Sequence, residues 1–435
     1  MLKRKISEYL VNWNEKEHKK CLIIDGPRQV GKTHIINEFI ANHYEENHVF
    51  YIDFRDNYRI SRIFKRGLDI SRIYQEIKLN APEKRLIEGE SIIYFDNIQL
   101  CPEILPYYRA FTEDGLYTII SSGSSLDVVL KSSSKFPIGF FDRYHLDSLD
   151  FEEFLWANGY DLEQVQYFFD LYHNNELKDS SIHGLLIDLF SEYLAIGGMP
   201  QVVSEYRKQH NFKLAFDLQR KIIDTYYMEM EVHTRHTMYA KVVDCFESIP
   251  IQLTKDNKKF QYRLVSENGR ATMYKKSVDW LVDSGIAIKS YNVSKPVRPI
   301  NENKKEQTFK LYIHDPGLLV SMYGENTQLE ILKGNLRVKN SAALENAVAT
   351  ILHRNNYDLY YFEKNSTLDI DFILTMNREI IPLLVKEADN AKSKALKSLE
   401  DKYGIYTGLR LSSLSSLEGT SKNIVPVYMA MNLEK

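Results

Sequence analysis

The sequence is poor in cysteine, in net charge and in long apolar runs, and each shortage excludes a class of protein. Its three cysteines are scattered, so they form neither a disulfide framework nor a metal-binding spacing and indicate a reducing compartment. The formal net charge of −3 gives no overall basic field of the kind that marks a nucleic-acid binder. No apolar run approaches the roughly 18 residues that span a bilayer, and the polar residues that follow the basic N-terminus form no signal-peptide core. We therefore expect a soluble, cytoplasmic protein without a membrane partner.

What the sequence does have is a glycine loop between an apolar run and a helical pattern. Residues 26–34 read Gly-Pro-Arg-Gln-Val-Gly-Lys-Thr-His and contain the pattern G-x-x-x-x-G-K-[ST]. In such a loop successive amides point at an anion, and the next helix directs its positive dipole end there. Lys32 would reach the β- and γ-phosphates, and the Thr33 hydroxyl would ligate Mg²⁺. The residues expected to bind ATP are Gly26, Pro27, Arg28, Gln29, Val30, Gly31, Lys32, Thr33 and His34; an ordinary glycine turn is the alternative.

A second motif ends another predicted strand. Residues 91–96 are an apolar run that closes on Asp96, which is typical of a Walker B strand. Ligands of open α/β sheets bind at the carboxyl edge, so Asp96 would hold the same Mg²⁺ as Thr33. We expect Lys32 and Asp96 to act in phosphoryl transfer. Asn97 follows where many such NTPases have a glutamate, and its amide can hydrogen-bond a water but cannot accept a proton.

Three further polar residues lie near the ends of predicted strands. Ser124 follows the apolar run 116–122 and is either a γ-phosphate sensor or part of a polar turn. Arg143 precedes a strand predicted over 144–149 and would reach a γ-phosphate in its own site or in a neighbouring copy, or is a surface charge. Asp53 ends the strand predicted over 48–54, and a turn role is the favoured interpretation.

The remaining pattern outlines the other elements. Helices are predicted over 1–20 and 68–89, and residues 160–245 are helical with a sharp break at Gly197-Gly198. A helix, a strand from Ile286, a charged loop (295–307) and a strand over 308–315 outline a winged helix, a fold that binds either DNA or protein. A helix over 342–353 and strands over 357–362, 369–374 and 380–386 follow.

Taken together, these motifs resemble the bacterial and archaeal ATP-binding proteins of the AAA superfamily that carry a C-terminal DUF4143 domain. The matching segments are G-x-R-Q-V-G-K-T at 26–33, D-x-I-Q at 96–99, S-F-E-E-F-like residues at 150–154, G-G-M-P at 197–200 and K-L-Y-x-x-D-x-G-L at 310–318. The resemblance implies an α/β fold: an AAA-type P-loop NTPase domain with a parallel sheet (1–160), a helical subdomain (161–245), a winged-helix-like domain (246–325) and a PD-(D/E)XK nuclease-like domain (326–435). It also implies ATP and Mg²⁺ as cofactors.

In three places the sequence departs from this family's pattern. Phe140 follows Gly139 where the family usually has a basic residue, although Arg143 is close by. Asn97 replaces the family's glutamate, and Leu384 replaces an acidic residue of the nuclease-like domain, in which Glu345, Asp371 and Lys386 would be the remaining site residues. A metal-dependent nuclease needs at least two acidic ligands and a lysine near the attacking water, so we expect no cleavage. Two functions follow from these observations: a slow Mg²⁺-dependent ATPase that couples nucleotide state to its C-terminal domains, or a nucleotide-gated module that binds DNA or protein with vestigial hydrolysis. An oligomer fits either function.

Overall fold

The computed structural model describes residues 2–67, 69–132, 139–174, 176–177, 181–336, 338–339, 341–364, 368–385, 394–413 and 424–433. The chain divides into two compact units, one of residues 3–147 with 283–285 and one of residues 148–282 with 286–435. The first unit therefore ends before the boundary predicted at residue 160. The predicted division of the remaining residues into three domains stays a prediction.

The first unit is built on a five-stranded parallel sheet with the strand order β2-β3-β4-β1-β5. Its strands are β1 (Cys21–Asp25), β2 (Val49–Asp53), β3 (Ile92–Asp96), β4 (Thr118–Ser122) and β5 (Phe141–His145). Every residue of β1, β3 and β4 is buried, as expected for strands of a parallel sheet that is covered on both faces. The predicted α/β fold with a parallel sheet is confirmed.

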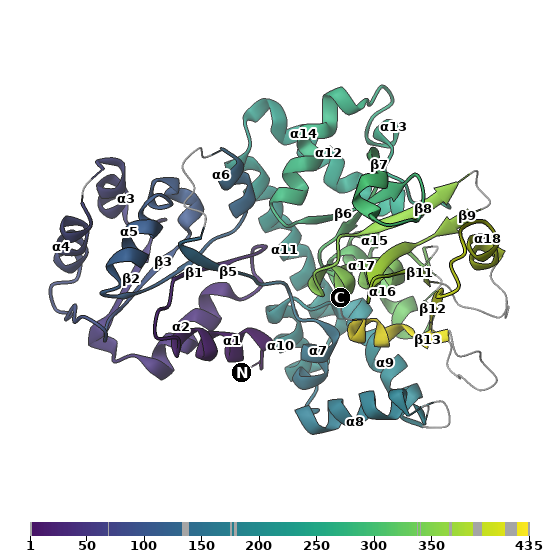
Figure 1. Cartoon of the computed structure of the whole chain (residues 1–435), viewed down its shortest axis with the longest axis horizontal. Helices are drawn as coiled ribbons and strands as arrows, with labels where there is room; N and C mark the ends of the chain where they lie inside the picture. Colours follow the sequence, from purple (N-terminus) through teal and green to yellow (C-terminus); the bar gives the residue numbers. More distant parts are fainter. Residues whose placement is uncertain are drawn as a thin grey trace. The chain divides into compact units, whose positions relative to one another are not determined.

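Helices cover both faces of this sheet, as Figure 1 shows. They are α1 (Lys5–Asn14), α2 (Lys32–His43), α3 (Tyr58–Lys65), α4 (Ile70–Asn80), α5 (Tyr107–Asp114) and α6 (Leu126–Ser132). Alternate strand side chains point to opposite faces, and one set, which includes Ile23, Phe50 and Phe95, forms a buried cluster with side chains of α3, α4 and α5. The carboxyl edge of the sheet, where β1 meets the loop before α2, is left for the functional site.

Two predicted elements of this unit have different bounds in the structure. The strand predicted over 144–149 is β5, and it pairs with β1 from Cys21↔Phe141 to Asp25↔His145. As the last strand of the sheet order, β5 is only partly buried, so its apolar pattern is weak and locates the strand poorly. The helix predicted over 68–89 is α4, which ends at Asn80 because Pro82 disfavours helical conformation in the residue before it.

The second unit begins with helices, which are α7 (Phe151–Ala157), α8 (Leu162–His173), α9 (Ser181–Ile196), α10 (Pro200–Gln209), α11 (Phe212–His233), α12 (His236–Leu253), α13 (Tyr262–Val265) and α14 (Ala271–Asp283). Later helices are α15 (Pro316–Tyr323), α16 (Glu325–Leu332), α17 (Ala342–Arg354) and α18 (Lys394–Tyr403). Among the described residues no helix is both long enough and apolar enough to cross a membrane.

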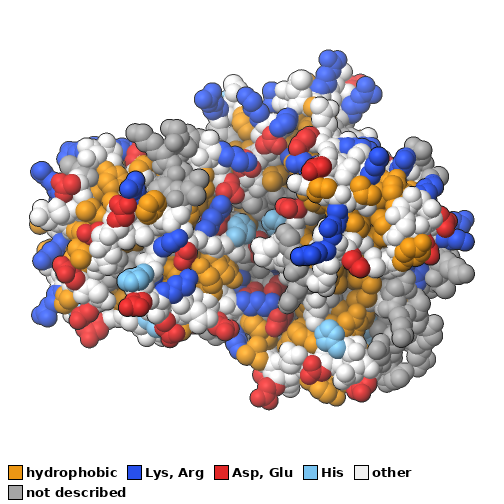
Figure 2. Space-filling model, viewed as in Figure 1, with side chains coloured by type: hydrophobic (Ala, Val, Ile, Leu, Met, Phe, Trp, Pro, Cys, Tyr) orange, Lys and Arg blue, Asp and Glu red, His pale blue; other side chains and the backbone are white. Residues whose placement is uncertain are grey.

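On the face drawn in Figure 2, Lys and Arg side chains lie interspersed with Asp and Glu.

Two four-stranded sheets complete the second unit. One has the order β7-β6-β8-β9 and consists of β6 (Ala287–Val293), β7 (Lys304–Ile313), β8 (Tyr360–Lys364) and β9 (Leu368–Ile370). The other has the order β10-β11-β12-β13 and consists of β10 (Phe372–Met376), β11 (Glu379–Val385), β12 (Leu409–Ser412) and β13 (Ile424–Pro426). The antiparallel pair β6–β7, predicted as a wing, also pairs through β6 with β8. β6 and β7 therefore share a sheet with strands of the C-terminal segment.

One buried carboxylate joins distant motifs of the second unit. Asp315 is fully buried, and its side chain accepts hydrogen bonds from Ser148 Oγ (2.7 Å), the Gly198 amide (2.8 Å) and the Leu318 amide (3.1 Å). A Cβ atom on Gly197 would lie 2.2 Å from Asp315 Oδ1, so only glycine fits there. The G-G-M-P and D-x-G-L segments are thus held together by one side chain, which also caps α15.

Replacing Asp315 with alanine is expected to destabilise the second unit strongly. The change leaves the buried Gly198 amide and the Ser148 hydroxyl without this acceptor and removes the cap of α15, which together cost roughly 3 kcal/mol or more. Urea unfolding followed by circular dichroism measures the loss. Asp217→Ala, which removes an exposed carboxylate from α11, is the matched control and should change the free energy of unfolding by less than about 0.5 kcal/mol. Equal effects of the two changes would contradict this account.

Candidate nucleotide-binding site

The glycine loop joins the end of β1 to the start of α2. Gly26 has a φ of +137°, and a Cβ atom there would lie 2.0 Å from the Leu146 carbonyl oxygen, so no other residue fits. Gly31 is the N-cap of α2 in the left-handed conformation (φ +96°). The Lys32 ammonium donates to the carbonyl oxygens of Gly26 (2.8 Å) and Pro27 (2.6 Å). The loop therefore curls around its own lysine at the positive end of a helix, which is a geometry suited to an anion.

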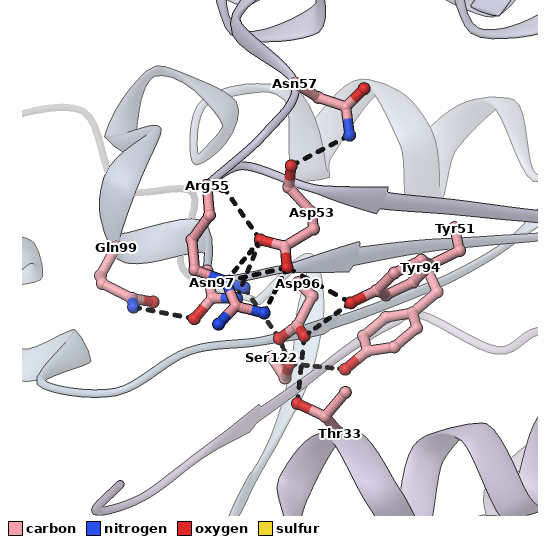
Figure 3. A network of polar contacts seen from close by, with 10 residues as sticks. All are labelled: Thr33, Tyr51, Asp53, Arg55, Asn57, Tyr94, Asp96, Asn97, Gln99 and Ser122. Carbon is pink, nitrogen blue, oxygen red and sulfur yellow. Dashed lines mark hydrogen bonds and ion pairs between the residues drawn. The ribbon is translucent and has the colours of Figure 1, made fainter.

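The structure brings Thr33 and Asp96 together, as their motifs predicted. Thr33 Oγ1 donates to Asp96 Oδ2 at 3.0 Å, and Asp96 is 3 % exposed (Figure 3). The other carboxylate oxygen accepts from the Asn97 amide (2.9 Å) and from Ser122 Oγ. A hydroxyl and a carboxylate are hard oxygen ligands of the kind that Mg²⁺ takes beside nucleotide phosphates. The residues present therefore fit a magnesium–nucleotide complex.

Asn97 forms a turn and binds its neighbours. Its backbone is left-handed (φ 59°, ψ 44°), a conformation that asparagine tolerates better than most residues. Its Nδ2 donates to Asp53 Oδ1 (3.0 Å), and its Oδ1 accepts from Gln99 Nε2 (3.3 Å). Asn97 is thus a link between two side chains of the carboxyl edge.

Asp53 lies in this network, although the sequence favoured a simple turn role. Its carboxylate accepts from the Arg55 amide (2.9 Å) and forms an ion pair with the Arg55 guanidinium (2.6 Å). Burial alone would raise the pKa of Asp53, but hydrogen bonds from Arg55 and Asn97 hold that pKa below its usual value. The side chain is therefore ionised at neutral pH. The turn role is real as well, because the Asn57 amide donates to the Asp53 carbonyl at 3.0 Å.

The serine that contacts the Walker B carboxylate is Ser122. Ser122 Oγ donates to Asp96 and is 2.8 Å from Tyr94 Oη. Ser124 is buried, and its amide donates to Gln99 Oε1 at 3.3 Å. The sequence showed only that Ser122 ends an apolar run, and the pairing of β4 with β3 that brings it to Asp96 comes from the structure. The sensor role of Ser124 stays a prediction.

Arg143 lies inside β5, not before it, and pairs with acids of its own unit. Its guanidinium binds Asp25, the residue before the glycine loop, and Asp127 Oδ1 at 2.9 Å. Burial works against its charge, but the two carboxylates raise the pKa of Arg143. His145 also approaches Asp25, at 3.2 Å, and although burial lowers its pKa, Asp147 and Asp25 raise that pKa to about 10. These contacts fix the end of β1, from which the loop departs; a γ-phosphate role for Arg143 stays a prediction.

The acidic residues expected to belong to a nuclease-like site form a buried cluster with lysines. Glu345 on α17 binds Lys258 Nζ (2.5 Å), Lys310 Nζ (3.0 Å) and Tyr312 Oη (2.6 Å). Burial and the Glu345 charge raise the pKa of Asp371 to about 6. The described residues contain no group of three or more His, Cys, Asp or Glu that could hold a metal ion. Lys386 lies outside the described residues.

Comparisons with known proteins match three stretches of the chain. An AAA domain model matches residues 18–155, a domain of unknown function (DUF8612) matches residues 187–329, and a second domain of unknown function (DUF4143) matches residues 340–426. An uncharacterized protein of Methanocaldococcus jannaschii is 22% identical over 391 residues, which cover 88% of this chain and 78% of the relative.

Two solved structures are similar to parts of the chain. A Walker-type ATPase of Pyrococcus abyssi has a TM-score of 0.47 and 15% identity, covering 74% of this chain and 96% of that chain. The Orc1 protein of Aeropyrum pernix in complex with DNA has a TM-score of 0.28 and 12% identity, covering 75% of this chain and 92% of that chain.

Replacing Glu345 with glutamine is expected to lower the free energy of unfolding by roughly 3–5 kcal/mol, because two buried ammonium groups lose their counter-charge. Thermal and urea unfolding measure the change, and Glu400→Gln on the exposed side of α18 is the matched control. Adding Lys310→Met to Glu345→Gln should recover part of the loss, since one unpaired charge is removed. If Glu345→Gln left the free energy of unfolding unchanged, Lys258 and Lys310 would not need the Glu345 charge to remain buried.

Proposed function

Because this chain joins an AAA-type P-loop domain to a C-terminal DUF4143 domain, we propose that it binds ATP with Mg²⁺ in the glycine loop and hydrolyses it slowly. The observation that supports this most directly is the 3.0 Å contact between Thr33 Oγ1 and Asp96 Oδ2 at the start of α2. It joins the two motifs that this chemistry requires, from positions far apart in the sequence.

Each part of the loop has a distinct role in this proposal. The backbone N–H groups of residues 28–34, which include the N-terminus of α2, bind the phosphate oxygens. Lys32 exchanges the carbonyl oxygens of Gly26 and Pro27 for the β- and γ-phosphates, where its charge stabilises the transferring group. Thr33 and Asp96 would hold the magnesium ion, which would supply positive charge beside the phosphates. The rate is low because the side chain of Asn97 cannot take a proton from water.

The alternative is a nucleotide-gated binding module, and two observations favour it over an efficient motor. Asn97 occupies the usual glutamate position, and in the nuclease-like segment Glu345 is neutralised by two lysines. ATP would then act as a ligand whose presence or absence changes the affinity of the second unit for DNA or protein. Cleavage of a nucleic acid is not part of either function.

Lys32→Ala is expected to weaken ATP binding at least 100-fold and to abolish turnover, since the change removes the positive charge that the loop surrounds. Titration calorimetry with Mg²⁺-ATP measures binding, and phosphate release measures turnover. Lys78→Ala, which removes an exposed lysine of α4, is the charge-matched control and should leave both unchanged. Unchanged affinity in Lys32→Ala would end the proposal.

Binding to a labelled DNA duplex with and without ATP decides whether DNA is the partner. Phosphate contacts by lysine and arginine make affinity fall steeply with salt, by roughly 10³-fold or more between 50 and 200 mM for six or more contacts. We expect any DNA binding to show this fall and to depend on ATP. If no duplex binds at low salt in either nucleotide state, a protein partner is the remaining form of the alternative.

A further inference from the structure

A second carboxylate stands beside Asp96 at the carboxyl edge of the sheet. Asp53 ends β2 and Asp96 ends β3, and the two residues are register partners in neighbouring parallel strands. Register partners in neighbouring parallel strands point their side chains to the same face. Asp53 thus supplies, from the neighbouring strand β2, a carboxylate in the region where a glutamate at position 97 would place one.

A continuous chain of contacts connects Asp53 to the proposed magnesium ligands. Tyr51 Oη donates to Asp96 Oδ2 at 3.1 Å and lies 3.5 Å from Asp53 Oδ2. Asp96 Oδ2 is also the atom that accepts from Thr33. Figure 3 shows these side chains converging from β2, β3 and α2 on one point. The Tyr51 hydroxyl therefore links Asp53 to Asp96, the carboxylate proposed to hold the magnesium ion.

The orientation of Asp53 is fixed from two sides. Asn97 Nδ2 binds Oδ1 at 3.0 Å, and the Arg55 guanidinium binds Oδ2 at 2.6 Å. Oδ1 also accepts from the Arg55 backbone N–H (2.9 Å) and Oδ2 from Arg55 Nε (2.9 Å), so these donors fill the roughly four acceptor positions of an ionised carboxylate. The Arg55 side chain is 62% exposed, and by turning toward solvent or phosphate it would open a position on Oδ2 for a water. The Asn97 side chain and the Arg55 backbone N–H keep the carboxylate oriented while the guanidinium gives way to a water.

We propose that Asp53 orients the water that attacks the γ-phosphate, and that Asn97 positions Asp53 for this task. The inference rests on the proposed ATPase function. In the step, the water oxygen bonds to the γ-phosphorus while the bond from that phosphorus to the β–γ bridging oxygen breaks. ADP leaves with the electron pair, and the proton lost by water ends on inorganic phosphate. Asp53 accepts the hydrogen bond that directs the water in line.

The test compares Asp53→Asn with the wild type in nucleotide affinity and in kcat. We expect kcat to fall about 100-fold or more while the Kd for Mg²⁺-ATP changes by less than about threefold, because the phosphates are held by the loop. Asp56→Asn removes an equal charge from an exposed position in the same turn and should change neither value. Asp53→Glu, which retains the carboxylate, should recover part of kcat.

Two further variants test whether Asp53 orients the attacking water or only stabilises the turn after β2. Arg55→Gln breaks the same ion pair but keeps the carboxylate, so its loss of kcat should be at least tenfold smaller than that of Asp53→Asn. Asn97→Glu in the Asp53→Asn background restores a carboxylate at this edge and should raise kcat at least tenfold. Equal losses in Asp53→Asn and Arg55→Gln, or no rescue by Asn97→Glu, would overturn the inference.

The outcomes also distinguish this inference from the function on which it rests. A wild type that binds no ATP, or that releases no phosphate from it, contradicts the ATPase proposal itself. A wild type that hydrolyses ATP together with an Asp53→Asn variant that hydrolyses it equally well contradicts only the role of Asp53.

Discussion

The hydrogen bond between Thr33 and Asp96 is the contact on which the proposed function of the first unit depends. Thr33 lies in the first turn of α2, and Asp96 ends a strand that β4 separates from β1. The two meet only because parallel strands deliver their carboxyl ends to one edge and because Gly26 and Gly31 let the chain reverse tightly above it. Tyr51, Ser122 and Asn97 all converge on the same carboxylate. The edge is therefore a connected polar network and not a set of separate residues.

The parts of this site that could be predicted from the sequence are those encoded by local spacing. Lys32 and Thr33 are fixed relative to the loop by the strand–loop–helix pattern, and Asp96 is fixed by its place at the end of an apolar run. The contacts of Asp53 and Ser122 could not be predicted, because each depends on which strands become neighbours. Asn97 was predicted as a residue that can hydrogen-bond a water but cannot accept its proton; its left-handed turn and its bond to Asp53 could not be predicted, because they follow from tertiary structure alone.

The same reasoning explains where the fold prediction was less accurate. β5 has a weakly apolar pattern, and its bounds are set by pairing with β1. The ion pair of Arg143 with Asp25 could not be predicted, because the two residues are distant in sequence and adjacent only across that pairing. The β6–β7 pair resembled an independent wing, and nothing local indicated that β6 would also pair with β8.

The Glu345 cluster has a consequence for how this architecture can be divided. The glutamate belongs to the C-terminal segment, whereas its lysines come from the residues before α13 and from β7. Two of the matching family models leave a gap between residues 329 and 340. Cutting the chain in this gap would separate Glu345 from both Lys258 and Lys310. Recombination or subcloning at that point would produce two pieces, each with an uncompensated ion in its interior. We therefore expect the two segments to fold stably only when they are present together.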